Sequence, residues 1–145
     1  KIYDILYKTL NSISSAETKV AVMLAVIKFQ LKIMIEAGFS IELDRCLHCH
    51  KKIENETLFF VREAGGVICS DCANNIVYNK KQMPYKLRDF LKQMLVNDFE
   101  TSGEYEKKAN EKVCDITFNL LKDYIELKSP KKIKSSDILR ELPAV

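Results

Sequence analysis

The sequence predicts a mainly α-helical protein, a helical bundle into which a small cysteine-bearing β-hairpin module is inserted after the second helix. Three observations predict this class. Segments near both ends of the chain repeat apolar residues at the spacing of helix faces. Two Cys-x-x-Cys pairs, Cys46–Cys49 and Cys69–Cys72, interrupt this helical pattern. Two short β-like apolar runs lie between the pairs, and we predict that the pairs bind one structural Zn²⁺ ion.

Length and composition fit one ordered domain over residues 1–145, with the zinc-binding insertion at about residues 44–78. Apolar residues make up 47% and charged residues 30%, and there are only four glycines and three prolines. The longest apolar stretch, Val20–Ile27, is far too short to span a bilayer. We therefore expect a cytoplasmic protein with no membrane partner. The opening at Lys1, without an initiator Met, is interpreted as a piece cut from a longer chain.

The first predicted helix covers residues 2–13, where four apolar residues are spaced as one helical face. These residues are Ile2, Leu6, Leu10 and Ile13. Ser14 and Glu17 match a capping box for a second helix over about residues 16–37. That helix is apolar around most of its circumference and is expected to end at Gly38, so we predict that the other helices pack around it.

The inserted module contains two predicted strands, at residues 58–61 and 66–68, joined as a hairpin. Gly65 and Gly66 are expected to supply the positive φ angles of the turn. A short helix is expected from Ala73 to Val77.

Helices resume after the module. Pro84 suits the first turn of a helix with apolar positions at Leu87, Phe90, Leu91, Met94 and Leu95. Thr101 and Glu104 form a possible capping box for a further helix that Ser129-Pro130 ends. Its predicted core stripe consists of Tyr105, Ala109, Val113, Ile116, Leu120, Tyr124 and Leu127. A last short helix is predicted over residues 138–142, capped by Ser136 or Asp137.

The cysteine spacing C-x2-C-x19-C-x2-C is typical of a four-cysteine zinc site, with Cys46, Cys49, Cys69 and Cys72 as ligands. A disulfide framework is disfavoured because the cysteine count is odd and no signal peptide is present. A redox pair is disfavoured because the chain lacks a βαβ context. Four thiolates close the coordination sphere, which argues against catalytic zinc. The fifth cysteine, Cys114, lies in an apolar helical pattern and is predicted to be a core residue.

His48 and His50 flank Cys49, and either imidazole could replace one thiolate as a ligand. Four well-spaced cysteines make this replacement unnecessary, so a solvated ring or a hydrogen bond to a sulfur is the simpler interpretation. The sequence contains only these two histidines and no P-loop, GxGxxG motif or Ser/His/Asp set. We therefore predict that the protein is not an enzyme and has no small-molecule substrate.

Two basic clusters are candidate DNA-binding surfaces. The first cluster consists of Lys80, Lys81, Lys86 and Arg88 and is extended by Lys92. The second consists of Lys131, Lys132 and Lys134 and is extended by Lys128 and Arg140. A solvated helix face and an unstructured tail explain these clusters equally well. The formal net charge is +3. Four thiolates contribute −4 and one Zn²⁺ contributes +2, so the holo-protein carries about +1 and overall charge does not indicate nucleic-acid binding.

Several strings resemble the C-terminal domain of the bacterial RecO family. The resemblance is carried by Phe29–Leu31, Glu36–Phe39, Leu43–Cys46, Phe59–Cys69 and Asp71-Cys72. The lysine-rich end at residues 127–136 is also similar. It extends over essentially the whole chain. His50 departs from the pattern, since a small residue such as Gly commonly follows a Cys-x-x-Cys knuckle.

The resemblance implies a non-catalytic DNA repair and recombination mediator of the RecF pathway. It implies binding to single- and double-stranded DNA, to RecR and to the acidic C-terminal tail of single-strand-binding protein (SSB), which helps load recombinase onto SSB-coated strands. It also implies an N-terminal OB-fold domain that is absent from this chain, and a cytoplasmic protein associated with the nucleoid during repair. Lys28 and Lys32 are candidate cations for the tail, without an assigned pocket.

Two other function classes remain. A zinc-stabilised helical scaffold for protein–protein assembly, without nucleic-acid contact of its own, fits the near-neutral holo charge. A zinc hydrolase or redox enzyme needs an open metal position or a reactive thiol, which a closed Cys₄ site does not offer.

Overall fold

The computed structural model describes residues 1–54, 56–77, 79–97, 99 and 109–129. The predicted capping box at Thr101 and Glu104, the stripe residue Tyr105, the predicted last helix and the basic tail lie outside these residues. No helix in the described part of the chain is long and apolar enough to cross a membrane.

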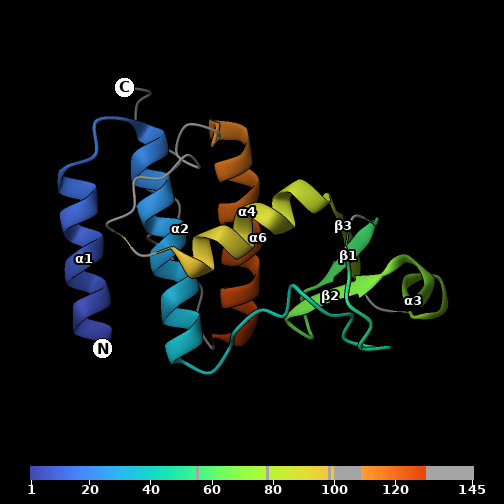
Figure 1. Ribbon diagram of the computed structural model, residues 1–145. Coiled ribbons are helices and arrows are strands. Elements are labelled where there is room, and N and C mark those ends of the chain that lie inside the picture. Colours follow the sequence, from blue (N-terminus) through green and yellow to red (C-terminus); the bar gives the residue numbers. More distant parts are fainter. Residues whose placement is uncertain (55, 78, 98, 100–108, 130–145) are drawn as a thin grey trace.

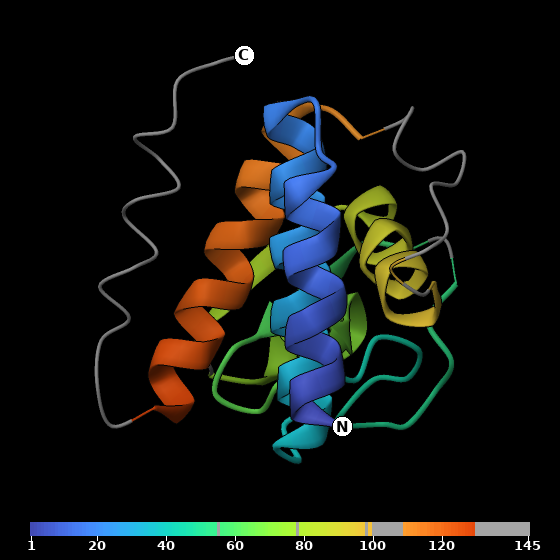
Figure 2. The same ribbon diagram turned by 90° about the vertical axis from the view of Figure 1, so that its left-hand side faces the viewer.

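Helix α2 (Lys19–Glu36) occupies the centre of the helical part, as the sequence predicted. It contacts α1 (Ile2–Ser14) on one side and α4 (Tyr85–Val96) and α6 (Glu111–Lys128) on the other. Figures 1 and 2 show α1 as an outer layer over α2, with the sheet on the opposite side of the bundle.

The two ends of α2 follow different local signals. At its C-terminus Gly38 has φ +81°, Phe39 N–H donates to Met34 O (2.8 Å) and Gly38 N–H donates to Ile35 O (3.0 Å), which together form a Schellman motif. Gly38 is thus confirmed as the terminator.

The predicted capping box at the start of α2 is wrong. Ser14 is the last residue of α1, and its hydroxyl donates to Asn11 O. Thr18 is the N-cap instead, because its backbone is extended and its Oγ1 accepts the N–H of Ala21 (3.2 Å).

The inserted module is a three-stranded antiparallel sheet with strand order β2-β1-β3. Strands β1 (Leu58–Val61) and β2 (Gly66–Cys69) form the predicted hairpin. Strand β3 (Lys80–Met83) pairs with β1 and lies beyond the predicted end of the insertion at residue 78. Its sequence, KKQM, carries no apolar alternation, so period-2 patterning could not find it.

Two local predictions in the module need correction. Helix α3 (Ser70–Asn75) begins directly after β2 and contains Cys72, three residues before the predicted start at Ala73. Gly65 has the expected positive φ of 70°, but Gly66 does not. Gly66 is required by close packing, since a Cβ there would lie 2.9 Å from Glu42 O.

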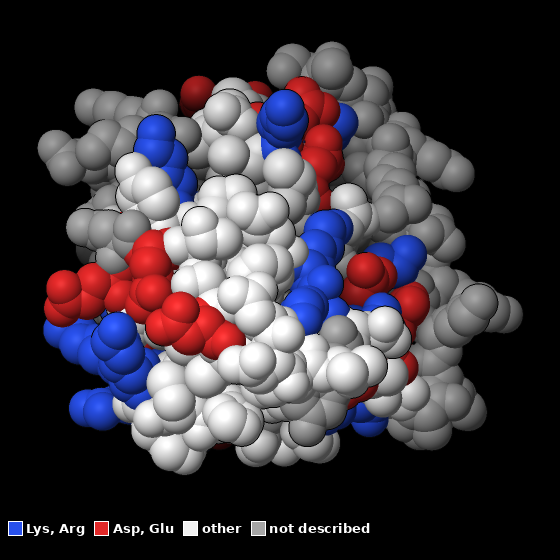
Figure 3. All heavy atoms as spheres, turned by 90° about the vertical axis from the view of Figure 1, so that its right-hand side faces the viewer, with Lys and Arg blue, Asp and Glu red and all other residues white. Residues whose placement is uncertain are grey.

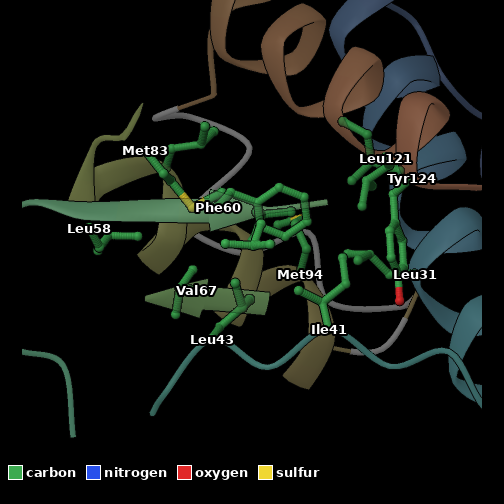
Figure 4. Close-up of a cluster of buried hydrophobic side chains, with 14 of the residues drawn as sticks. Leu31, Ile41, Leu43, Leu58, Phe60, Val67, Met83, Met94, Leu121 and Tyr124 are labelled. Carbon is green, nitrogen blue, oxygen red and sulfur yellow. The ribbon is translucent and has the colours of Figure 1, made fainter. Parts of the chain in front are cut away.

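Sheet and helices share one apolar core. Figure 4 shows Phe60 of the sheet pointing toward the helices that carry Leu31 and Leu121, with Val67 beside Leu43 in the same cluster. The rings of Phe60 and Tyr124 meet edge to face, with centroids 6.2 Å apart. The module is therefore packed onto the bundle rather than standing apart from it.

The predicted buried faces of α1 and α6 are both partly wrong. In α6 the buried residues are Cys114, Thr117, Phe118, Leu121 and Tyr124. Of the predicted stripe, Ile116 is 41% exposed and Leu127 is 45% exposed. In α1 the buried residues are Ile5 and Thr9, whereas Leu6 and Leu10 are exposed. The buried faces include Thr9 in α1 and Thr117 in α6, so apolar periodicity alone cannot tell which side of each helix is buried.

Candidate metal centre

Four cysteines from three segments meet at the end of the sheet farthest from the bundle core. Cys46 and Cys49 lie in the loop between α2 and β1, Cys69 ends β2, and Cys72 lies in α3. Their Sγ atoms all lie within 4.8 Å of one another. The structure thus brings together the four residues that the sequence singled out.

The first knuckle is built by local hydrogen bonds. Glu42 Oε1 accepts the N–H groups of Asp44 (2.7 Å) and Arg45 (3.1 Å), which turns the chain just before Cys46. His50 N–H then donates to Cys46 O (2.9 Å), closing a tight turn. This closure requires a left-handed residue, and His50 has φ +60°.

Backbone bonds also hold the two knuckles against each other. Val67 N–H donates to Glu42 O (3.1 Å), and Leu47 N–H donates to Val67 O (2.9 Å). The first knuckle is thereby added to the free side of β2, so the Cys46 loop is placed by the strand that ends in Cys69.

The sulfur geometry fits a tetrahedral metal ion. Cys49 Sγ and Cys69 Sγ are 3.8 Å apart. A tetrahedron with metal–sulfur bonds of about 2.3 Å has edges of about 3.8 Å. All five cysteines are free thiols, so no disulfide competes for these sulfurs. Four sulfur donors would leave no position for water or substrate on the metal.

The thiols of the metal-free cluster differ in acidity. Burial raises the pKa of Cys46, but N–H donors of Cys49, Cys69 and His48 outweigh this effect and lower the pKa to about 6. One of these donors, Cys69 N–H, lies 3.4 Å from Cys46 Sγ. The pKa of Cys69 is raised by burial, and that of Cys72 is raised by its hydrogen bond with Cys69 and by burial. A cation that binds here therefore displaces protons, and its affinity rises with pH.

Exposure also differs among the four. Cys46 and Cys69 are buried, Cys72 is half-buried and Cys49 is exposed. Cys114 lies away from the cluster in the bundle core, as predicted, and burial raises its pKa to about 11.

His48 contacts the cluster without displacing a sulfur. Its Nδ1 lies 3.5 Å from Cys72 Sγ, which is within hydrogen-bond range for sulfur. This contact matches the interpretation that the imidazole supports a cysteine ligand.

The candidate DNA-binding residues near the module have different environments. Lys81 and Lys86 are exposed. Lys80 Nζ donates to Ala73 O and Ile76 O, so it caps the end of α3. Arg88 is only 5% exposed. Lys131, Lys132 and Lys134 lie outside the described residues.

Arg88 joins the metal-bearing loop to α4. Its Nη1 donates to Ile53 O at 2.6 Å, and its Nη2 lies 2.9 Å from Asp89 Oδ1. The sequence did contain a signal for this role: Arg88 is three residues before Leu91 and follows Leu87, so it lies on the buried face of α4.

Two further contacts fix the module to the bundle. Lys92 forms an ion pair with Asp44. At the hairpin turn, Lys128 Nζ donates to Glu63 O (3.0 Å), and a Cβ on Gly65 would lie 2.3 Å from Tyr124 Oη. The turn therefore rests directly on α6, where only glycine fits.

Basic side chains do not form one continuous band on the module side. Figure 3 shows Lys and Arg in separate patches, divided by acidic residues and by a broad uncharged area. Contacts to a long polyanion on this face would be made by individual patches.

Comparison with known proteins identifies the family. Residues 1–137 match the family model described as "Recombination protein O C terminal". The chain belongs to the RecO family, in its C-terminal domain. This confirms the resemblance seen in the sequence.

Three similar relatives are each named "DNA repair protein RecO". The protein of Desulforamulus reducens is 22% identical over 97% of this chain and 52% of its own length. The Clostridium acetobutylicum protein is 25% identical over 77% of this chain and 42% of its own length. That of Dehalococcoides mccartyi is 37% identical over 32% of this chain and 18% of its own length. The chain spans about half the length of these relatives or less.

Proposed function

We propose that this chain is a non-catalytic module of a DNA repair and recombination mediator, which binds DNA and partner proteins and helps load recombinase onto SSB-coated single strands. The observation that carries the proposal is the family match over residues 1–137. By the same membership, the longer protein carries an N-terminal OB-fold domain, and RecR and the SSB tail are partners. The zinc-binding insertion, predicted at about residues 44–78, extends to Met83 because β3 belongs to its sheet.

One structural Zn²⁺ ion is the proposed occupant of the cysteine cluster. Support comes from four sulfur donors at tetrahedral spacing, which suit zinc better than hard cations. Cobalt substitution tests it: Co²⁺ should give the visible absorption of a tetrahedral thiolate complex, and Cys69→Ser should abolish it. A spectrum of octahedral Co²⁺ would contradict the Cys₄ site.

A cavity between α1 and α2 supports binding of an acidic, apolar peptide such as the SSB tail. It has a volume of about 520 Å³ and is lined by Leu24 and Phe99 together with Tyr7, Lys8 and Lys28. The lining is mixed, because it also contains Asp4, whose carboxylate lies 3.8 Å from Lys8 Nζ. Its lysines can neutralise ligand carboxylates, and Leu24 and Phe99 can bury an aromatic end.

The test is a fluorescence-anisotropy titration of a labelled SSB C-terminal peptide with the zinc-loaded chain. Saturable binding that a scrambled peptide does not reproduce supports the mediator proposal. Lys8→Glu should weaken it by about tenfold, equivalent to about 1.4 kcal/mol. Lys112→Glu makes the same charge change on α6, outside the cavity lining, and should leave affinity unchanged. Absence of binding would assign tail recognition to the rest of the longer protein.

DNA binding is proposed through the exposed Lys81 of β3 and Lys86 of α4, and through Lys131, Lys132 and Lys134 in the tail. Such phosphate contacts are independent of sequence and weaken steeply with salt. Charge reversal of the three tail lysines should lower both the affinity and its salt slope. The alternative, a scaffold without nucleic-acid contact, is favoured by the small net charge, and absence of DNA binding by the intact chain would support it.

A further inference from the structure

In the part of the chain that the structure describes, nothing pairs with the outer edge of the three-stranded sheet along β3. In the order β2-β1-β3, the free side of β2 is covered by the Glu42–Leu47 segment. Within the described residues, β3 pairs only with β1. An unpaired strand edge is a template for another extended chain.

The register shows which backbone groups point outward. Val67 uses its N–H and C=O to bond Glu42 and Leu47, so it is not hydrogen-bonded to the opposite residue Phe60. Phe60 must then bond β3, through its partner Lys81. Lys80 and Gln82, which alternate with Lys81, consequently direct their N–H and C=O away from the sheet. No backbone hydrogen bond between described residues uses these groups.

A cationic groove lies beside this edge. It has a volume of about 420 Å³ and runs between the sheet and α6, with Phe60, Arg62 and Lys81 on the sheet side and Leu120 and Asp123 on α6. Arg62 pairs with Glu63 at 3.5 Å, but both side chains are about two-fifths exposed, so that pair is weak and a ligand carboxylate can replace it.

We propose that β3 accepts a fourth strand, an extended acidic segment of a protein partner, whose apolar side chains enter the groove while its carboxylates meet Lys81 and Arg62. Strand addition of this kind takes its affinity from backbone hydrogen bonds and its specificity from side-chain pockets. This binding mode goes beyond the proposed function, which does not use the β3 backbone.

The charges along β3 indicate which kind of chain can pair with its open edge. A second copy of this chain would place Lys80 and Lys81 against the same lysines, which is unfavourable for strand pairing. A nucleic-acid strand offers no row of N–H donors to the outward carbonyls of Lys80 and Gln82, and these carbonyls repel phosphate. The N–H groups of an acidic polypeptide can donate hydrogen bonds to these carbonyls, and its carboxylates can form ion pairs with the lysines.

The test uses the zinc-loaded chain and a fluorescent ten-residue peptide with the repeat Glu-Glu-Val-Val, so that each face of the extended peptide carries both residue types. Saturable binding is expected. Gln82→Pro should weaken it by at least about tenfold, because proline removes an outward N–H without breaking a bond to β1. Gln82→Ala keeps the N–H and should bind like the unaltered chain. Equal thermal stability of the two variants would show that the fold is retained.

A second pair of variants tests the charge. Lys81→Glu should weaken peptide binding, whereas Lys86→Glu, the same change outside the groove lining, should not. Peptide binding that Gln82→Pro leaves unchanged, or no saturable binding, overturns the proposal.

Labelled single-stranded DNA is titrated in parallel, because Lys81 also belongs to the proposed DNA surface. DNA binding that depends on Lys81, without peptide binding, would assign the groove to nucleic acid and overturn the strand-addition proposal.

Discussion

At the residue scale, His50 is the position where the sequence conflicts most clearly with its local backbone. It is the only non-glycine residue with positive φ among the described residues. Left-handed backbone costs a residue with a Cβ roughly 1–2 kcal/mol. The knuckle tolerates this cost because His50 N–H closes the turn on Cys46.

Replacing His50 with glycine should therefore stabilise the knuckle. His50→Gly is expected to raise the free energy of unfolding by about 0.5–1 kcal/mol, and to tighten zinc binding, because glycine adopts positive φ without steric strain. Urea unfolding measures the free energy of unfolding, and competition with a chelator measures the zinc affinity. His48→Gly is the matched control: it removes the contact with Cys72 at a residue without positive φ, and should weaken metal binding. Weaker binding by His50→Gly would show that the imidazole itself contributes to the site.

At the element scale, sequence patterns predicted which elements exist better than which side of each one is buried. Helices α1, α2, α4 and the β1–β2 hairpin were predicted close to their observed bounds, because their periodicities are strong and turn residues flank them. The buried sides of α1 and α6 depend on where α2 lies, which is tertiary information. Strand β3 forms because β1 offers it a partner, and its own residues carry no such preference.

Helix α4 illustrates how two basic residues within one turn acquire different roles. Arg88 is buried and bonded to Ile53 O, whereas Lys86 is exposed. Arg88→Met should lower the free energy of unfolding by about 1.5–3 kcal/mol, since it leaves a buried carbonyl without its charged donor. Lys86→Met should stay within about 0.5 kcal/mol of the unaltered chain. Urea unfolding measures the stability of each variant, and DNA titration at two salt concentrations measures its contribution to DNA binding. Unchanged stability with a lower salt slope for Arg88→Met would support the prediction that Arg88 contributes to DNA binding.

At the scale of the whole molecule, the cysteine spacing was enough to predict the cluster, but not how firmly the module is attached. Each Cys-x-x-Cys spacing is a local feature of one short turn, so the sequence alone is enough to recognise it. Attachment arises from long-range contacts: Arg88 to Ile53 O, Lys128 to Glu63 O, and a shared core. A small metal-binding module that stood alone would owe its fold to the metal. Since its sheet packs on the bundle, we now expect the metal to order mainly the two knuckles.

Metal removal distinguishes these two expectations. After chelation, amide exchange should rise in the Glu42–Lys52 loop and in α3, while β1 and α2 keep most of their protection, because Phe60 and Val61 remain packed in the core. Alkylation followed by mass spectrometry gives an independent measurement. The four clustered cysteines should react after chelation but not before it, and Cys114 should stay unmodified in both states, since burial raises its pKa to about 11. The unaltered chain in excess Zn²⁺ is the control. Loss of protection throughout β1, α2 and α6 on chelation, with alkylation of Cys114, would show instead that the metal holds the whole domain together.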